Sequence, residues 1–542
     1  MSPGVLIVGG SPAGVQAALD LAEAGIEVLL TEISPFIGDD PVSMPLDYIS
    51  NTHALLAAKH PRIHLLTRTA LKHVEKTADA FKVRLQIRPR YVDLNRCTSC
   101  ADCLEVCPVK VPGENHQAIY LRDGHQPESA VIDKMGLAPC SHACPAGIHV
   151  QGYVALIAQG RFQEALDLVR EAIPFAGICG RICTHPCEIN CRRSEVDEPV
   201  AIRQLKRFVA DWELKKAQPS NRKKAAIPSP AGDAKRIAIV GAGPAGLAAA
   251  HDLALKHYNV TVFEKLPVAG GMMAVGIPSY RLPRDILKAE INAIEEMGVT
   301  IRTGIAFGTD LNIKALRSKG YSALFLATGL PANRRLGVAG ENLSGVFDGV
   351  SFLRDVALGK KVSTAEKLIV VGGGNVAIDV ALTARRLGSK SVTIVCLETR
   401  QEMPARDDEI KEALEAGVKI VNCFGPHRFL GKNNQFTGIE FKRCTGVFDD
   451  QCRFNPQYDE NERNTLEAQA VMIAIGQRAE KNFLETEDLM QSPWGGIQAD
   501  PQTLQTSIPW VFAGGDALYG PKTVIEAIAS GKQAAESIDR FL

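Results

Sequence analysis

Cysteine is the residue type with the most obvious chemistry in this chain. Ten of the 14 cysteines fall between positions 97 and 191. The first four follow the pattern C-x2-C-x2-C-x3-C-P and are Cys97, Cys100, Cys103 and Cys107, ahead of Pro108. Thiolates at this spacing wrap one iron–sulfur cube and lend the fourth sulfur to a neighbouring cluster. The pattern predicts a module that transfers single electrons.

Six more cysteines follow, the last four of them at every fourth position: Cys140, Cys144, Cys179, Cys183, Cys187 and Cys191. Disulfide frameworks belong to small secreted chains, and structural zinc sites use paired C-x2-C knuckles. We therefore assign all ten cysteines to iron–sulfur clusters, with zinc as the alternative. The remaining four have no ligand spacing and are expected to be ordinary core or surface thiols: Cys396, Cys423, Cys444 and Cys452.

Length and composition indicate a large protein with several domains. With 542 residues, 46% of them hydrophobic, the chain should form three or four domains with sizeable cores. Lys plus Arg and Asp plus Glu are 61 each, so no bulk charge attracts nucleic acid or an anionic membrane. No apolar run approaches the roughly 20 residues needed to cross a bilayer, and the first residues do not resemble a secretion signal. We expect a cytoplasmic protein with reduced thiols and no direct membrane insertion.

Three segments each combine a β-branched strand, a glycine turn and an alanine-rich helix. The strands are expected at 5–8, 237–240 and 368–371. The turns contain Gly9, Gly10 and Gly14, then Gly241, Gly243 and Gly246, and finally Gly372, Gly374 and Ala377. Such a turn lets a pyrophosphate lie against bare backbone at a helix N-terminus. One such turn is weak evidence alone, because tight strand–helix turns also occur without a ligand.

Acidic residues at the ends of the next strands strengthen this prediction. Glu264 ends the strand after the second turn, and Glu398 follows the strand after the third. Both positions suit a carboxylate that accepts hydrogen bonds from a ribose. An anionic Glu398 repels a 2′-phosphate and so favours NADH over NADPH, although the nearby Arg400 keeps the phosphorylated form open. The alternative for Glu398 is a solvated charge at a strand end.

The second and third units together resemble one flavoprotein with a nested nucleotide domain. Gly271 and Met272 form a turn suited to laying backbone beside an isoalloxazine, and Thr328 closes the first half. The third unit then interrupts the domain, and Gly515 and Asp516 complete it near the C-terminus. Asp516 is placed to accept hydrogen bonds from ribityl hydroxyls, beside the start of the following helix. The order of these turns predicts an FAD site.

From about residue 138 to the end, the chain resembles the small subunit of glutamate synthase and the flavin half of dihydropyrimidine dehydrogenase. The matching motifs are Ala138-Pro139-Cys140-x3-Cys144-Pro145, Cys179-Gly180-Arg181-Ile182-Cys183, Gly241-Ala242-Gly243-Pro244-Ala245-Gly246, Gly372-Gly373-Gly374-Asn375 and Ala513-Gly514-Gly515-Asp516. The resemblance implies one FAD, one nicotinamide site that includes Asn375, and two [4Fe-4S] clusters. NADPH-using relatives carry paired arginines where this chain has Leu397 and Glu398, which again favours NADH.

Residues 1 to about 135 are instead similar to the start of the A-type subunit of heterodisulfide reductase. The similarity lies in the opening glycine turn, the stretch 89–93 and the ferredoxin-like cysteines. Ser11 replaces the middle glycine of the turn, Asp39 and Asp40 stand where relatives have small residues for flavin contact, and no closing Gly-Asp motif follows. Although Glu32 is well placed for a ribose, we favour a remnant domain that braces the cluster module or a partner over a second FAD site.

The expected fold class is α/β: tandem Rossmann-like FAD and NAD domains of the glutathione-reductase type, a small helical iron–sulfur domain and a truncated N-terminal Rossmann-like domain. The expected boundaries are 1–90 for the partial Rossmann-like domain, 91–135 for a ferredoxin-like segment, 136–212 for the helical iron–sulfur domain, 213–235 for a linker, 236–345 and 469–542 for the FAD domain, and 346–468 for the inserted NAD domain.

The cluster ligands depart from the resemblance at two places. Ile132 and Met135 stand where it implies a C-x2-C pair, so the Cys97–Cys107 group could supply those thiolates. Lys206 stands where the dihydropyrimidine member uses a glutamine ligand, and a protonated lysine cannot ligate iron. The open candidates for that place are Cys179, His142, His185 and Gln204. Ten cysteines allow two or three clusters.

These features lead to one main functional hypothesis. The chain is expected to oxidise NADH through FAD and pass single electrons through its clusters to a partner subunit of a larger complex. Heterodisulfide-reductase-like, hydrogenase, dehydrogenase and synthase partners would all suit it. The alternatives are an electron-bifurcating subunit, a self-contained disulfide reductase, which lacks a C-x2-C pair near the flavin turns, and a scaffold with relic sites. No acid–base residue is assigned, because hydride transfer demands none.

Overall fold

The computed structural model describes residues 4–37, 47–77, 80–107, 109–111, 116–134, 136–216, 234–362, 364–480 and 485–542. The chain divides into two units, Met1–Leu137 and Ala138–Leu542. Several positions singled out above lie outside the described residues: Asp39, Asp40, Pro108, Met135 and residues 217–233 of the expected linker. Among the described residues, no helix has both the length and the apolar character that crossing a bilayer requires.

The first unit begins with half of a Rossmann sheet. Its parallel strands have the order β1 (Val5–Val8), β2 (Val28–Thr31) and β3 (Ile63–Leu66), with α1 (Pro12–Glu23) and α2 (Asp47–Lys59) packed on it. β1 pairs only with β2 among the described strands. A complete doubly wound sheet would continue at that edge. The truncation expected from the sequence is therefore confirmed.

The rest of the first unit consists of short elements around the first cysteines. They are the hairpin β4 (Thr69–Lys76) and β5 (Phe81–Ile87), helix α3 (Asp102–Glu105), and the ribbon β6 (Ile119–Tyr120) and β7 (Val131–Ile132). Arg90 anchors the approach to the cysteines. Its buried guanidinium donates hydrogen bonds to the carbonyl groups of Pro35, Ser129 and Ala130.

The second unit starts with a group of helices that carries six cysteines. They are α4 (Pro139–His142), α5 (Val150–Ala158), α6 (Phe162–Ala172), α7 (Ala176–Ile182), α8 (Pro186–Ile189), the 3-10 turn η1 (Arg192–Glu195) and α9 (Ile202–Lys216). In α6, Ala165, Leu166 and Val169 are buried, as the helical spacing of apolar residues predicts. α9 continues to Lys216, so a helix covers the first residues of the expected linker.

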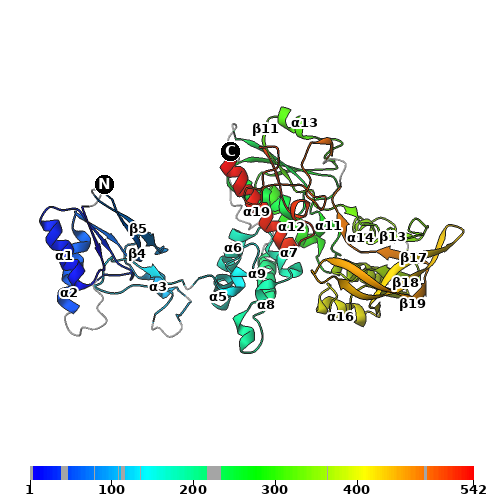
Figure 1. The fold of residues 1–542 in the computed structure, drawn as a ribbon, viewed down its shortest axis with the longest axis horizontal. Helices are drawn as coiled ribbons and strands as arrows, with labels where there is room; N and C mark the ends of the chain where they lie inside the picture. Colours follow the sequence, from blue (N-terminus) through cyan, green and yellow to red (C-terminus); the bar gives the residue numbers. More distant parts are fainter. Residues whose placement is uncertain are drawn as a thin grey trace. The chain divides into compact units, whose positions relative to one another are not determined.

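Next comes a parallel sheet that carries the second glycine turn. Its strand order is β10 (Thr300–Thr303), β9 (Asn259–Glu264), β8 (Arg236–Val240), β11 (Tyr321–Leu326) and β22 (Val511–Ala513). Helices α10 (Pro244–Leu255), α12 (Arg284–Glu295), α13 (Ile313–Ser318) and α19 (Val524–Phe541) accompany it (Figure 1). α10 and α19 cross closely, since a Cβ at Gly531 would lie 2.1 Å from the carbonyl oxygen of Ala245.

A second parallel sheet is inserted between β11 and β22. Its strand order is β13 (Val346–Asp348), β20 (Ala470–Ile473), β14 (Lys367–Val371), β15 (Ser391–Val395) and β16 (Lys419–Val421). Helices α14 (Gly349–Ala357), α15 (Asn375–Arg386) and α16 (Asp407–Glu415) belong to this domain. So does the antiparallel sheet of β17 (Phe424–Lys432), β18 (Gln435–Phe448) and β19 (Phe454–Glu467) (Figure 1). The short strands β12 (Ala332–Asn333) and β21 (Gln477–Arg478) pair where the chain enters and leaves the insertion.

One hydrophobic core joins the helical cysteine group to the first of these sheets. The same cluster of buried residues includes Ile178 and Val209 from the helical group and Ile239, Leu253 and Ile528 from the sheet domain. Contiguous burial of this kind resists relative movement, because separating the two parts would expose apolar surface to water. The cysteines of this unit therefore have a fixed position relative to the glycine turn after β8.

Candidate functional site

The turn between β8 and α10 is built to bring backbone close to a ligand. Gly241 has φ +104°, and a Cβ there would lie 2.3 Å from the carbonyl oxygen of Ala327. A Cβ at Gly246 would lie 1.9 Å from the carbonyl oxygen of Gly241. Gly243, the N-cap of α10, faces open space instead. The amide end of α10 is thus accessible to a pyrophosphate.

Glu264, the last residue of β9, is tied to this turn. Its carboxylate accepts hydrogen bonds from the amides of Ala242 and Leu266, both at 2.8 Å. Burial raises the pKa of the Glu264 carboxyl, and the backbone donors act in the opposite direction. Glu264 is 7% exposed, so its side chain is held in one place. From there it could accept hydrogen bonds from the hydroxyls of an adenosine ribose.

The other residues predicted to bind FAD lie at the same edge of the sheet. Gly271 has φ +53° and precedes the short helix α11 (Met272–Val275), and its Cβ would lie 2.8 Å from the Cα of Gly243. Thr328 follows β11, and Gly515 follows β22. Because β11 and β22 are paired and parallel, their carboxyl ends meet at one edge. Ligands of open α/β sheets bind there.

Asp516 begins the short helix α18 (Asp516–Tyr519), and burial raises its pKa to about 6. The next helix, α19, is capped by Thr523, which forms a reciprocal capping box with Glu526. A cavity of about 500 Å³ lies beside these elements, and its lining includes Gly515, Tyr519, Lys522, Pro145 and Ala146. The loop after Cys144 and the turn after β22 therefore border the same cavity.

The third glycine turn, between β14 and α15, has the same construction. Gly372 has φ +134°, and its Cβ would lie 2.4 Å from the carbonyl oxygen of Ala474. Gly374 is the N-cap of α15, and Ala377 is fully buried. Asn375, the first residue of α15, accepts a hydrogen bond from the amide of Arg406 at 3.0 Å. The amide end of α15 is available to a second dinucleotide.

Glu398 lies against this turn. A Cβ added to Gly373 would be 2.6 Å from a carboxylate oxygen of Glu398. The carbonyl group of Glu398 is fixed by the side-chain amide of Asn422 and the backbone amide of Cys423. Arg400, in the same segment, pairs with Asp407 at 3.2 Å. The geometry thus places an anionic side chain, rather than an arginine, beside the turn.

Three cysteines of the helical group, Cys179, Cys183 and Cys187, are buried in one hydrophobic core, and Cys144 packs against it. Burial raises the pKa of the Cys179 thiol and, to about 12, that of Cys187. The charges of Cys144 and Cys183 add to both shifts. Cys140 instead lies near Cys191, which adds to the burial that raises its pKa.

This arrangement suits a cluster better than a single ion. Within the described residues, no three His, Cys, Asp or Glu side chains converge on one metal-ion position. A cube does not need that convergence, because each of its four cysteine ligands binds a different iron atom. Several thiols in one helical group are the donor set that iron–sulfur clusters use.

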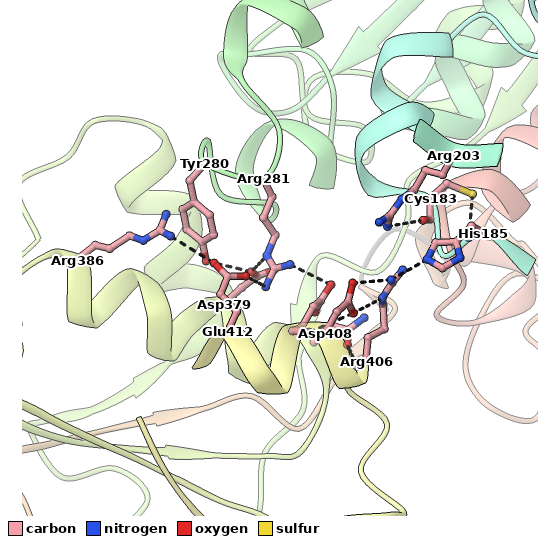
Figure 2. Close-up of polar contacts among 12 residues, drawn as sticks. Cys183, His185, Arg203, Tyr280, Arg281, Asp379, Arg386, Arg406, Asp408 and Glu412 are labelled. Carbon is pink, nitrogen blue, oxygen red and sulfur yellow. Dashed lines mark hydrogen bonds and ion pairs between the residues drawn. The ribbon is translucent and has the colours of Figure 1, made fainter. Parts of the chain in front are cut away.

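His185 lies between this cysteine group and the inserted domain (Figure 2). Its backbone amide donates to the sulfur of Cys183 at 3.4 Å, and its Nε2 is 2.7 Å from the guanidinium of Arg406. Its Nδ1 lies 3.0 Å from a carboxylate oxygen of Glu188. Both ring nitrogens therefore face protein groups. Arg406 connects the cysteine group to Asn375 in the glycine turn before α15.

A second polar junction joins the two sheet domains (Figure 2). Arg281, in the segment before α12, contacts three carboxylates of the inserted domain, those of Asp379, Glu409 and Glu412. Burial raises the pKa of Asp379 to about 6 and that of Glu409 to about 7. Three carboxylates thus face the guanidinium of Arg281, and Arg386 also pairs with Glu412.

In the first unit, Cys97, Cys100 and Cys103 lie close together. The pKa of Cys103 is raised chiefly by burial, and also by Cys100 and Cys97. Ser99 and Ala101 have φ +58° and +67°, so the backbone curls tightly around Cys100. Cys107 follows on the far side of α3. The C-x2-C-x2-C segment thus forms a compact loop of thiols.

Glu32 of the first unit repeats the contacts of Glu264. Its carboxylate accepts hydrogen bonds from the amides of Gly10 and Ser34, both at 2.6 Å. However, a Cβ at Gly10 would lie 2.3 Å from Ile37, so the turn is packed against the unit's own side chains. Glu32 thus has the same backbone contacts as Glu264, on a sheet of three described strands.

Comparison with known proteins agrees with this architecture. The family model "Pyridine nucleotide-disulphide oxidoreductase" matches residues 235–531, more than half of the chain. The chain belongs to the pyridine nucleotide-disulphide oxidoreductase family. The model "Dihydropyrimidine dehydrogenase domain II, 4Fe-4S cluster" matches residues 134–218, and the model "FAD dependent oxidoreductase" matches residues 4–102. These matches confirm the resemblance to the flavin half of dihydropyrimidine dehydrogenase.

Curated relatives of this family member are subunits of redox enzymes. The chain is 44% identical over 429 residues to NADP(+)-dependent formate dehydrogenase subunit beta of Moorella thermoacetica, covering 75% of this chain and 60% of the relative. It is 38% identical over 440 residues to NADPH-Fe(3+) oxidoreductase subunit beta of Geobacter sulfurreducens, covering 76% and 64%. It is 34% identical over 413 residues to the NAD-dependent dihydropyrimidine dehydrogenase subunit PreT of Escherichia coli, covering 75% and 91%.

The matched part of the chain spans less than two thirds of the first two relatives, so parts of those proteins have no counterpart in the match. Two of the three relatives are named for NADP(H) and one for NAD. The comparison therefore supports a nicotinamide nucleotide in general and does not select one of the two forms.

One residue that joins the helical cysteine group to the sheet domain was not identified from the sequence. Glu290, on α12, accepts hydrogen bonds from the amides of Gly177 and Ile178 at the start of α7, at 2.6 and 3.0 Å. Burial raises its pKa to about 7. It fastens the helix that carries Cys179 to the sheet domain. Its sequence position, on one face of an amphipathic helix, carries no feature that would have identified it.

Proposed function

We propose that this chain oxidises NADH or NADPH with bound FAD and passes the electrons singly through [4Fe-4S] clusters to a partner redox subunit. The observation that carries the proposal is the shared core of the cysteine helices and the sheet with the second glycine turn. Pro145 and Ala146, in the loop after Cys144, and Gly515 line one cavity. Thiolate clusters and flavin would then be neighbours in one rigid unit.

In this proposal each group of residues has a defined task. Gly241, Gly243, Gly246 and Glu264 bind the pyrophosphate and ribose of FAD, and Asp516 accepts hydrogen bonds from its ribityl chain. Gly372, Gly374 and Asn375 bind the nicotinamide nucleotide, and Glu398 receives its ribose. Bound flavin accepts two electrons together and releases them one at a time. The buried cysteines hold the one-electron carriers away from water.

Nucleotide choice rests on Glu398. Its carboxylate lies against Gly373, where a 2′-phosphate would meet like charge. We therefore propose that NADH is preferred over NADPH, although two of the relatives are named for NADP(H). The partner is proposed to be another redox subunit of a dehydrogenase, hydrogenase, heterodisulfide-reductase or synthase complex; two of the relatives are named as subunits of dehydrogenases.

The test is anaerobic NADH-dependent reduction of benzyl viologen by the purified chain, with iron, acid-labile sulfide and FAD measured in the same preparation. We expect viologen reduction and rapid bleaching of the flavin absorbance on NADH addition. Thiol titration before and after NADH distinguishes a disulfide reductase, in which two thiols per flavin would appear. A preparation with FAD and iron whose flavin is not bleached by NADH or NADPH would refute the proposal.

A further inference from the structure

Three consecutive residues, Tyr280, Arg281 and Leu282, bridge the cores of the two sheet domains. Leu282 is fully buried in the core that the first sheet shares with the cysteine helices. Tyr280 instead packs against the hydrophobic core of the inserted domain. Arg281 lies between them at the boundary, where its side chain is 17% exposed. The segment between α11 and α12 therefore has one residue at each core and an arginine at the junction.

The same segment is fastened to the turn that is predicted to contact the flavin. Arg284, the first residue of α12, donates hydrogen bonds to the carbonyl groups of Met273 at 2.9 Å and Ile277 at 2.7 Å. Met273 belongs to α11, the short helix that directly follows that turn. The amide of Arg281 donates to the carbonyl group of Pro278 at 3.1 Å, which closes a tight turn. Arg281 therefore has a fixed position relative to the flavin turn.

On the other side of the junction, the contacts end on α15, the helix that begins at the third glycine turn (Figure 2). The guanidinium of Arg281 and the hydroxyl of Tyr280 donate to the same carboxylate oxygen of Asp379, the hydroxyl at 3.2 Å. Asp379 is 8% exposed and lies one helical turn after Asn375. Arg386, also on α15, places its guanidinium carbon 3.3 Å from the centre of the Tyr280 ring. Two adjacent residues of one domain thus bind α15 of the other at two positions.

Arg281 also reaches α16. Its Nη1 lies 3.0 Å from a carboxylate oxygen of Glu409, and its Nη2 lies 3.6 Å from one of Glu412. A carboxylate that is removed from water depends on a nearby cation for compensation. The planar fork of arginine presents several donors at once, whereas the ammonium of lysine is a point charge. One guanidinium therefore connects three carboxylates on two helices of the inserted domain.

We propose that Arg281 is a positioning residue for flavin reduction, because it fixes α15, and with it the third glycine turn, relative to the flavin turn before α11. The inference rests on the proposed function, since it concerns how the two nucleotide sites approach each other. Reaction between two bound groups depends steeply on their placement, and a displacement of about 1 Å can cost about a hundredfold in rate. Without Arg281, three carboxylates would face one another, and their repulsion would push the domains apart at this point.

The first experiment follows flavin bleaching by NADH, and in parallel by NADPH, in a stopped-flow instrument with wild type, Arg281→Met and Lys390→Met. We expect the limiting rate constant of Arg281→Met to fall about tenfold or more. The nucleotide concentration for half-maximal rate and the FAD content should keep their wild-type values. Lys390 forms an exposed ion pair with Glu366 in the same domain, with side chains 74% and 66% exposed. Lys390→Met is therefore the matched control and should leave the rate constant unchanged.

The second experiment measures amide hydrogen exchange without added nucleotide, in peptides that cover residues 276–283 and 376–386. Both peptides should exchange faster in Arg281→Met than in wild type, because the junction opens more often. Lys390→Met should exchange as wild type does. Arg281→Lys keeps the charge but loses the fork, so its limiting rate constant should lie between those of wild type and Arg281→Met. This variant also supplies the test if Arg281→Met does not accumulate.

An unchanged limiting rate constant in the Arg281 variants would overturn the inference. A lower rate that is matched by loss of FAD or by weaker nucleotide binding would also overturn it, since that pattern indicates damage to a nucleotide site. Unchanged hydrogen exchange would refute the role of Arg281 in holding α15. A wild-type flavin that neither NADH nor NADPH bleaches would instead refute the proposed function, so the two failures are distinguishable.

Discussion

At the scale of single residues, one carboxylate geometry recurs at the glycine turns. Glu264 caps the amides of Ala242 and Leu266, and Glu32 caps those of Gly10 and Ser34. Both turns have backbone amides that are not paired within a helix or strand. A neighbouring carboxylate can accept hydrogen bonds from them. This carboxylate geometry does not by itself indicate a bound ligand, because Ile37 packs closely against the turn at Gly10.

Glu264→Ala tests whether this acid binds FAD. We expect FAD affinity to fall about tenfold or more, because hydrogen bonds to a charged group contribute about 1.5–3 kcal/mol each. The measurement is FAD retained per chain after dialysis, with Glu32→Ala as the matched control. One FAD per chain in both wild type and Glu32→Ala would fit a remnant first unit. Loss of flavin from Glu32→Ala would show that the first unit also holds FAD.

Glu398→Arg tests the nucleotide preference. Replacing an anion by a cation beside the ribose should raise the ratio of kcat/KM for NADPH to that for NADH by about tenfold or more. Steady-state viologen reduction with both nucleotides measures that ratio. Lys411→Met, an exposed change on α16 with a side chain 77% exposed, should leave it unaltered. An unchanged ratio in Glu398→Arg would contradict our account of nucleotide choice.

At the scale of elements, the close approach of α7 and α9 decides where the cysteines lie. The approach is possible because residue 180 has no side chain. Glu290 adds a second constraint from α12, by capping the first amides of α7. The short helix α7, which would be unstable in isolation, is thus fixed by a glycine contact and one buried carboxylate.

Gly180→Ala should therefore disturb the cysteine group. The added Cβ would lie 2.7 Å from Arg207, and such overpacking costs about 1–3 kcal/mol. We expect a lower melting temperature and less iron per FAD. Gly446→Ala is the control, because its Cβ would meet no atom within 4 Å and its φ is not in the left-handed region. Equal melting temperatures for the two variants would argue against a tight α7–α9 contact.

At the scale of the second unit, polar junctions hold the inserted domain in addition to the two chain segments that enter and leave it. Arg281 faces three carboxylates of that domain, and Arg406 reaches His185 of the helical group (Figure 2). Polar junctions between domains are easier to open than apolar cores, because water replaces their hydrogen bonds. Ala357 and Leu358 of the inserted domain add apolar contacts to the core of the first sheet domain, so the polar junctions are the more easily opened part of this boundary.

The Arg281 junction predicts a pH dependence of stability. Asp379 and Glu409 have raised pKa values, about 6 and about 7, so the folded state binds their protons more tightly than the unfolded state does. This contribution to stability is fully present below the unfolded pKa values, near 4, and is lost as pH rises to about 7. Glu409→Gln removes one ionisation, so its melting temperature should exceed that of the wild type by about 2 °C at pH 8 and approach it at pH 5.

Melting curves of the wild type and Glu409→Gln at pH 5, 6, 7 and 8 measure this effect. Glu415→Gln, at the exposed end of α16 with a side chain 68% exposed, controls for the loss of one negative charge from the same helix. A wild-type melting temperature that rises from pH 5 to pH 7 relative to that of Glu409→Gln would contradict the predicted sign.

The sequence by itself determined the strand–turn–helix units, the acids that follow them and the grouping of ten cysteines. These are local patterns, since a glycine turn needs particular backbone angles and a cluster loop needs close spacing. The expected helix around Phe162–Val169 and the truncated first sheet were predictable for the same reason. Family membership followed from the order of these motifs along the chain.

Only the tertiary structure decided which distant residues meet. Glu290 of α12 contacts the start of α7, Arg406 lies beside His185 and Lys206 is buried in α9, although each side chain is of a type that is usually exposed. Nothing in the local sequence marks such a contact, because it depends on how whole helices pack.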